Sequence, residues 1–263
     1  MITRLAAAAV GLAVLLPAVV WGGVVAVDII VPIAALICLW EYAGMAFPDD
    51  RPAAMGFLVL GWLGVYLPPV YLGTGVEPVL LVVLAALVYV TFRPGETLDR
   101  AADQTARLVL GAVWIGFLVV LPLMRRADHG LAWIFLVLAV SWLGDTGGFF
   151  AGKYLGRHPM YPKVSPKKTW EGAFGGITLA TGGVFVVRAV GLPELSVVDC
   201  LILGPGLCVA GIVGDLSESM LKRSFGVKDS GAIMPGHGGL LDRIDSVLFV
   251  APLAWAWMVW VEG

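Results

Sequence analysis

The stretch VVDCLILGPGLCVAGIVGDL, residues 197–216, decides the fold class of this chain. It is a mostly apolar run of about the length that a helix needs to cross the roughly 30 Å hydrocarbon core of a bilayer. Similar runs recur along the 263 residues, which are 59% hydrophobic and 14% charged, whereas soluble domains carry about a quarter charged residues. Because backbone polar groups inside a bilayer must bond within their own segment, these runs predict helices. We therefore expect an all-α, polytopic transmembrane helical bundle.

About nine of these runs are expected to span the membrane. The first follows Arg4 and resembles a signal peptide, but further apolar runs follow at once, so we interpret it as a retained helix. Pro68 and Pro69 leave open whether the third run is one helix, a hairpin or a re-entrant piece. The expected spans are approximately residues 5–21, 24–47, 54–72, 76–92, 108–124, 131–150, 172–190, 197–216 and 246–261.

The basic residues are distributed unevenly among the connections. With nine spans, only Arg125, Arg126 and Arg188 of the 17 lysines and arginines lie on the side opposite the N-terminus. The positive-inside rule then places the N-terminus in the cytoplasm and the C-terminus outside. Whatever the exact count, two helices separate the two longest polar stretches, so both stretches are expected to emerge on the same face.

The densest polar stretch, residues 214–246, reads GDLSESMLKRSFGVKDSGAIMPGHGGLLDRIDS. Carboxylates supply the oxygen ligands that Mg²⁺ prefers, and lysine and arginine donate to phosphate oxygens. The mixture predicts a metal-dependent polyphosphate site. Its charged members are Asp215, Glu218, Asp229, Asp242, Asp245, Lys222, Arg223, Lys228 and Arg243.

Spacing within this stretch suggests two groups of carboxylates. If the eighth helix continues to residue 223, Asp215, Glu218, Ser219 and Lys222 recur at steps of three or four and share one helix face. Asp242 and Asp245, three apart, are expected to begin the last helix.

Between these groups, the bend PGHGG at residues 235–239 opens into a helix N-terminus, where an anion is favoured. His237 is the one histidine that we expect to contact phosphate. A solvated loop remains an equal alternative for residues 224–233. It is a weak alternative for Asp215 and Asp242, because each borders an apolar span.

The second polar stretch, residues 142–176, reads WLGDTGGFFAGKYLGRHPMYPKVSPKKTWEGAFGG. We expect Asp145 at a helix end followed by a glycine-rich turn. Ser165, Lys167 and Lys168 precede the next helix and are candidates to hold phosphate, with Glu171 in a capping role. A basic loop that only obeys the positive-inside rule or touches anionic headgroups is an equal alternative.

A few polar or reactive residues lie inside the apolar runs. Asp28 and Glu41 fall in the second span, where an ionisable side chain is by default a functional hypothesis, although Glu41 also fits an interfacial position beside two aromatic residues. The three cysteines show no metal-binding spacing and are interpreted as packing residues.

The polar stretches resemble those of the phosphatidate cytidylyltransferases, also called CDP-diacylglycerol synthases. The matching segments are SMLKR at 219–223, KDSG at 228–231, PGHGGLLDRID at 235–245 and SPKKTWEG at 165–172. The resemblance covers roughly the C-terminal half, while the N-terminal half agrees only in being a set of apolar helices. We accordingly divide the chain into scaffold helices at 1–130, with lipid access or dimer contacts, and a catalytic region at 131–263.

The resemblance implies an enzyme of the bacterial cytoplasmic (inner) membrane that transfers CMP from CTP to phosphatidic acid. It also implies a cytoplasm-facing site, a homodimer and membrane lipids as partners, with no nucleic acid. Asp215 and Asp242 would bind Mg²⁺ with support from Glu218, and a second, monovalent cation is allowed. The catalytic set would be Asp215, Asp242, Lys222, Arg223 and Asp245, and the substrate-binding set Ser165, Lys167, Lys168, Ser219, Lys228, His237, Gly238, Gly239 and Arg243.

Two other functions remain as alternatives at this point. A CTP-dependent polyprenol kinase also uses a cytidine nucleotide in the membrane, but it transfers only the γ-phosphate and forms CDP. A lipid transporter would place ionisable residues near the bilayer midplane on several helices, whereas here they gather at one face.

Overall fold

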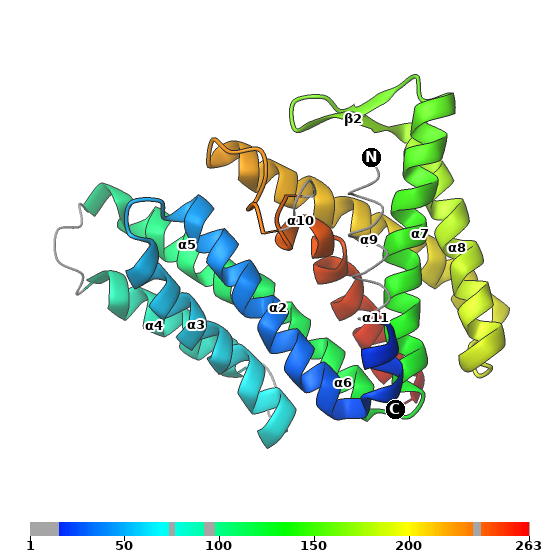
Figure 1. Ribbon diagram of the computed structural model, residues 1–263, viewed down its shortest axis with the longest axis horizontal. Coiled ribbons are helices and arrows are strands. Elements are labelled where there is room, and N and C mark those ends of the chain that lie inside the picture. The colour runs from blue at the N-terminus through cyan, green and yellow to red at the C-terminus, as the bar shows by residue number, and fades with distance from the viewer. Residues whose placement is uncertain (1–15, 74–76, 92–97, 234–237, 263) are drawn as a thin grey trace.

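Helices make up most of the computed structural model, which describes residues 16–73, 77–91, 98–233 and 238–262 (Figure 1). This confirms the expected all-α class. From Gly23 onward the helices are α2 Gly23–Ala46, α3 Arg51–Leu67, α4 Glu77–Thr91, α5 Leu98–Gly116, α6 Val120–Arg126, α7 Gly130–Leu155, α8 Trp170–Gly191, α9 Val197–Ser224, α10 Leu241–Ile244 and α11 Val247–Glu262. A π-helical turn, η1, covers Pro68–Leu72, and a 3₁₀ turn, η2, covers Phe117–Val119. The one antiparallel hairpin in the described chain, β1 Pro159–Tyr161 with β2 Ser165–Thr169, was not predicted.

Seven helices in the described ranges are long and apolar enough to cross a membrane, so the protein is an integral membrane protein. They correspond to seven of the nine expected spans. Of the other two, the run expected at 76–92 contains the shorter apolar helix α4, Glu77–Thr91, and residues 5–15 of the first run lie outside the described residues. The count of nine and the orientation of the N-terminus stay predictions. The seven segments are Gly23–Ala46, Arg51–Leu72, Arg100–Arg126, Gly130–Leu155, Trp170–Gly191, Val197–Ser224 and Leu241–Val261.

The proline pair after α3 does not reverse the chain. Pro68 and Pro69 begin η1, which continues the helix to Leu72 with a wider turn. Proline removes a backbone donor and crowds the preceding turn, and a π-helical turn is one way for a helix to accommodate it. The third span is therefore one helix rather than a hairpin.

The prediction of a glycine-rich turn after Asp145 is wrong. The helix α7 runs without interruption through Gly147 and Gly148 to Leu155. These glycines instead allow α8 to approach: a Cβ added to Gly147 would lie 2.5 Å from the carbonyl oxygen of Gly175, and one added to Gly176 would lie 2.8 Å from that of Gly144. Close backbone approach at small residues is a common way for membrane helices to pack. We call this contact the α7–α8 glycine seam.

The helix α9 extends beyond residue 223, as the prediction of a shared carboxylate face required. It begins at a capping box formed by Ser196 and Asp199 and continues to Ser224, well past the apolar run. Asp215, Glu218 and Lys222 therefore share one helical face, at spacings of three and four residues.

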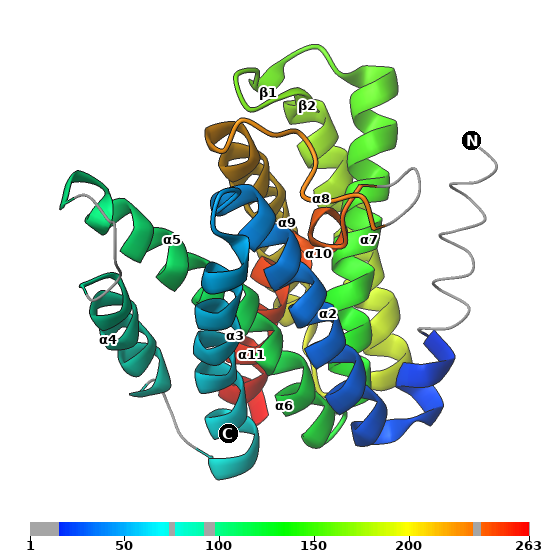
Figure 2. The same cartoon turned by 60° about the vertical axis from the view of Figure 1, so that its left-hand side comes forward.

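Two groups of helices pack side by side, with α9 crossing between them in both views (Figures 1 and 2). One group contains α2 to α6, and the other contains the α7–α8 pair, with the hairpin beyond the end of α7. A single hydrophobic cluster joins the two groups and includes Tyr42, Leu58, Trp133 and Leu248. The short helix α10 contacts α2, which brings the C-terminal polar stretch against the N-terminal half of the chain.

The hairpin is held at its base by Glu171, in the first turn of α8. Its carboxylate accepts hydrogen bonds from the backbone N–H groups of Arg157 and His158, at 3.1 and 3.2 Å, and contacts the His158 ring at 2.5 Å. Thr169 caps the same helix by accepting from the N–H of Gly172. These contacts fix the strand that carries Lys167 and Lys168 beside the end of α7.

Candidate active site

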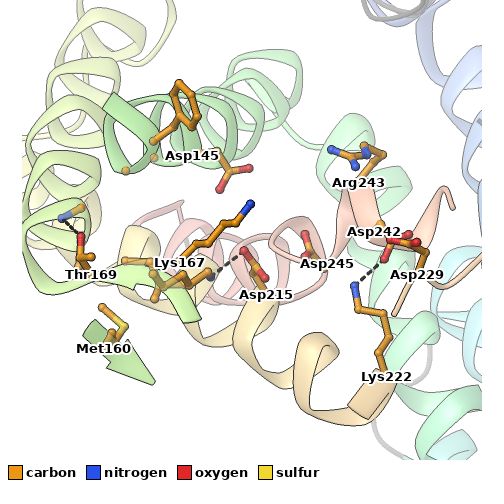
Figure 3. Close-up of a pocket in the computed structure, with 17 residues that line it drawn as sticks. Asp145, Met160, Lys167, Thr169, Asp215, Lys222, Asp229, Asp242, Arg243 and Asp245 are labelled. Atoms are coloured by element: carbon orange, nitrogen blue, oxygen red, sulfur yellow. Dashed lines mark hydrogen bonds and ion pairs between the residues drawn. The ribbon is translucent and has the colours of Figure 1, made fainter. Parts of the chain in front are cut away.

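The two polar stretches meet in one pocket of about 410 Å³ (Figure 3). This confirms the prediction that both emerge on the same face of the protein. Five aspartates and four basic side chains line it, and such a mixture suits a polyanionic ligand that arrives with a cation. The charged lining residues are Asp145, Asp215, Asp229, Asp242, Asp245, Lys167, Lys168, Lys222 and Arg243.

Lys222 lies at the centre of the ionic contacts on one side of the pocket. Its ammonium pairs with Glu218, one turn earlier on α9, and donates to Oδ1 of Asp242 at 2.5 Å. Glu218 and Lys222 are 1% and 8% exposed, so neither charge is compensated by bulk water. Lys222 therefore joins α9 to α10 through Asp242.

Asp242 has backbone partners in addition to Lys222. Its carboxylate also accepts from the N–H groups of Ser230, at 3.1 Å, and Gly239, at 2.8 Å. Gly238 has a φ of 82°, and a Cβ added there would lie 2.6 Å from Oδ2 of Asp242. Glycine at this position thus meets both a backbone and a space requirement.

The hairpin supplies the opposite wall. Lys168 pairs with Oδ2 of Asp215 at 2.6 Å, which links β2 to α9. Lys167 lines the same pocket, and Figure 3 shows its ammonium directed toward the space between Asp145 and Asp215. The second polar stretch therefore contributes charged groups to the site and is more than a connection between spans.

Several pocket residues had no role assigned to them from the sequence. Asp145 projects from α7, and Asp229 lies close to Asp242 in Figure 3. Both carboxylates stand in the polar stretches, so composition provided a signal for them, but the expected turn hid the position of Asp145. Apolar surface in the pocket comes from four further residues, Phe149, Met160, Ala173 and Ile212.

Some predicted residues lie behind or beside the pocket wall. Glu218 stands behind Lys222, Ser219 donates to Asp215 at 3.3 Å, and Arg223 donates to the carbonyl of Val227 at the end of α9. Ser165 begins β2, and Lys228 is exposed and does not line the pocket. His237 lies outside the described residues.

The helix start after the bend already has anionic partners. The N–H group of Gly239 is bonded to Asp242, and those of Leu240 and Leu241 are bonded to Glu41 of α2, at 2.9 and 2.8 Å. In this structure, carboxylates of the protein occupy the positions where a phosphate was expected. Glu41 is thus a residue of the site region that sequence reasoning left undecided.

The carboxylates of the pocket fit a divalent cation by their chemistry, because aspartate oxygens are the hard ligands that Mg²⁺ prefers. Asp215 and Asp242 are neutralised here by Lys168 and Lys222. Within the described ranges, no three His, Cys, Asp or Glu side chains are arranged as a metal-binding group. The donor set fits the ion, while the ligand identities stay predictions.

Long apolar helices that enclose a pocket of carboxylates and lysines define an integral membrane protein with a site suited to phosphate-bearing ligands. Comparison with known sequences gives the family. The sequence model described as "Cytidylyltransferase family" matches residues 2–261, and the chain belongs to that family.

Bacterial relatives of similar length agree with the family assignment. The phosphatidate cytidylyltransferase of Staphylococcus aureus (strain COL) is 35% identical over 261 residues, which cover 95% of this chain and 96% of that protein. The enzyme of the same name from Bacillus subtilis (strain 168) is 36% identical over 206 residues, 76% of each chain. That of Staphylococcus epidermidis (strain RP62A) is 42% identical over 141 residues, 54% of this chain and 53% of that protein.

Proposed function

We propose that this protein is a phosphatidate cytidylyltransferase, which transfers CMP from CTP to phosphatidic acid and releases pyrophosphate. The observation that carries the proposal is the single pocket to which both polar stretches contribute acidic and basic side chains. The family membership and the full-length relatives support the same activity.

The reaction needs orientation and charge compensation more than proton abstraction. A phosphate oxygen of phosphatidate attacks the α-phosphorus of CTP in line; a new P–O bond forms as the bond to the β-phosphate oxygen breaks, and pyrophosphate leaves with those electrons. Since the lipid phosphate is already anionic, no strong base is required. Lys167, Lys168, Lys222 and Arg243 would hold the two polyanions together and stabilise charge on the transferring group.

We propose that Asp215 and Asp242 hold Mg²⁺, with Asp145 and Asp245 lining the same pocket. The bound ion supplies positive charge against the phosphates of CTP, and a second, monovalent cation is compatible with the number of carboxylates. The support for this assignment is the donor chemistry of the pocket.

We also propose that the pocket faces the cytoplasm, from which CTP arrives, in the cytoplasmic membrane of a bacterium. The excess of lysine and arginine on that side supports this orientation. The acyl chains of phosphatidate would stay in the bilayer, and Phe149 and Met160 offer apolar surface at the pocket for the start of those chains. A homodimer, proposed from the resemblance alone, is testable by the protein mass in detergent.

The first experiment supplies purified protein with phosphatidic acid, Mg²⁺ and α-labelled CTP. We expect label in the lipid extract and an equal amount of pyrophosphate, both abolished by EDTA. Formation of CDP would instead support the polyprenol kinase alternative, and no turnover with any lipid would contradict the enzyme assignment.

The metal assignment is tested by Asp242→Asn. Loss of an electrostatic group in the site is expected to lower kcat by about 10²-fold or more. Asp49→Asn is the matched control, because Asp49 is an exposed aspartate in the connection between α2 and α3. Full activity of Asp242→Asn at wild-type Mg²⁺ dependence would contradict the metal role.

A further inference from the structure

Glu41 is a buried carboxylate in the N-terminal half of the chain that the proposed reaction does not use. It lies on α2 and is 2% exposed. Burying a carboxylate is costly unless it is well bonded, so its partners indicate what it does.

The partners of Glu41 all belong to the polar stretch that forms the pocket. Oε1 accepts from the N–H of Leu240 at 2.9 Å, and Oε2 accepts from the N–H of Leu241 at 2.8 Å and from the hydroxyl of Ser230 at 3.2 Å. Three donors thus converge on one carboxylate. Because Ser230 and Leu240 lie on either side of the bend, Glu41 fixes both ends of it.

The backbone around Glu41 leaves no room for side chains. A Cβ added to Gly231 would lie 2.5 Å from Oε1 of Glu41, and one added to Gly239 would lie 2.5 Å from Oε2 and 2.1 Å from the hydroxyl oxygen of Ser230. Glycine at these two positions allows the carboxylate to approach the backbone directly.

The same short segments also hold Asp242. The N–H of Ser230, whose hydroxyl bonds Glu41, donates to Asp242, and the N–H of Gly239 donates to Asp242 next to the two N–H groups that bond Glu41. Asp242 in turn pairs with Lys222. A continuous series of contacts therefore runs from α2 to the charged wall of the pocket.

We propose that Glu41 is a positioning residue for the cytidylyltransferase site, which holds Ser230 and the start of α10 so that Asp242 meets Lys222 and the pocket. The inference rests on the proposed function, because the property to be measured is the transfer of CMP. Glu41 itself does not line the pocket, so its effect is exerted through Asp242.

The test uses Glu41→Gln in the full-length protein. Glutamine has nearly the same size, but its NH₂ group would face backbone donors, so the start of α10 loses an acceptor. A displacement of about 1 Å in a catalytic group costs up to roughly 10²-fold in rate, and we expect kcat per folded protein to fall about 10- to 100-fold. The Mg²⁺ concentration for half-maximal activity should rise, and Asp49→Asn should leave both values unchanged.

A double-mutant cycle separates positioning from general support of the fold. In an Asp242→Asn background, Glu41→Gln is expected to lower kcat by less than about 2-fold further, because both changes act on one group. An equal loss of kcat in both backgrounds, or a wild-type kcat for Glu41→Gln alone, would overturn the proposal.

Hydrogen exchange gives a readout that does not depend on the reaction. The amides of Leu240 and Leu241 should exchange faster in Glu41→Gln, with α7 and α8 unchanged. If the wild-type protein forms no CDP-diacylglycerol, the proposed function fails; unchanged exchange at these two amides would overturn the role of Glu41 in either case.

Discussion

At the scale of single residues, the site depends on one buried lysine shared by two carboxylates. Lys222 compensates Glu218, which is buried behind it, and Asp242, which lines the pocket. Removing one member of such a group leaves an uncompensated charge in a region with little water. The resulting loss of free energy is larger than the stabilisation that the intact group provides.

We predict that Lys222→Met lowers the free energy of unfolding by about 3–5 kcal/mol, because Glu218 loses its counter-ion. Adding Glu218→Gln should recover most of this loss, since the neutral side chain no longer needs the ammonium. Thermal unfolding in detergent measures both effects. Activity should stay low in both variants, because the pocket still lacks its lysine; equal stability of Lys222→Met and wild type would contradict the prediction.

The sequence predicts part of the site at this scale. Helical spacing was sufficient to place Asp215, Glu218 and Lys222 on one face, since a regular helix leaves no other arrangement. It was not sufficient to pair Lys168 with Asp215 or Lys222 with Asp242, because those partners come from different elements. The contacts of Glu41 could not be predicted for the same reason, because Glu41 and Ser230 are 189 positions apart in the sequence.

At the scale of elements, the α7–α8 glycine seam sets the geometry of the pocket. It positions α7, which carries Asp145, against α8, whose first turn holds the hairpin through Glu171. The glycine pattern predicts the wrong structure here, because glycine permits a turn and also permits close packing of helices. Only the partner helix distinguishes these two uses.

We predict that Gly147→Ala destabilises the protein by about 1–3 kcal/mol and lowers activity, because the new methyl group meets backbone atoms of α8 that have little freedom to move. Gly182→Ala on α8 is the matched control, since a Cβ there meets nothing within 4 Å and alanine favours a helix. Melting temperature and CMP transfer measure the difference. Equal behaviour of the two variants would show that the seam tolerates a side chain.

At the scale of the whole molecule, α7 separates two connections that should lie on opposite sides of the membrane. Its 26 residues span roughly 39 Å at 1.5 Å per residue, from the turn containing Asp128 to the hairpin containing Lys163. Both of these residues are exposed, whereas all three native cysteines are buried.

We predict that Lys163→Cys reacts with a membrane-impermeant maleimide only when the cytoplasmic face is accessible, as in inverted vesicles. Asp128→Cys should react only from the opposite face, as in intact spheroplasts. The reason is the excess of basic residues on the hairpin side. The wild-type protein, whose three cysteines are buried, provides the background control. The reverse pattern of labelling would contradict the proposed orientation of the site.

The contact between Glu41 and Ser230 also has a consequence for biosynthesis. At a translation rate of about 5–20 residues per second, the ribosome needs roughly 10–40 s to add the 189 residues that follow Glu41 up to and including Ser230. During that interval α2 carries its carboxylate without the three donors that satisfy it in the finished protein. The pocket is therefore assembled only after the last helices have been synthesised, and a nascent chain that ends before Ser230 has no functional site to expose.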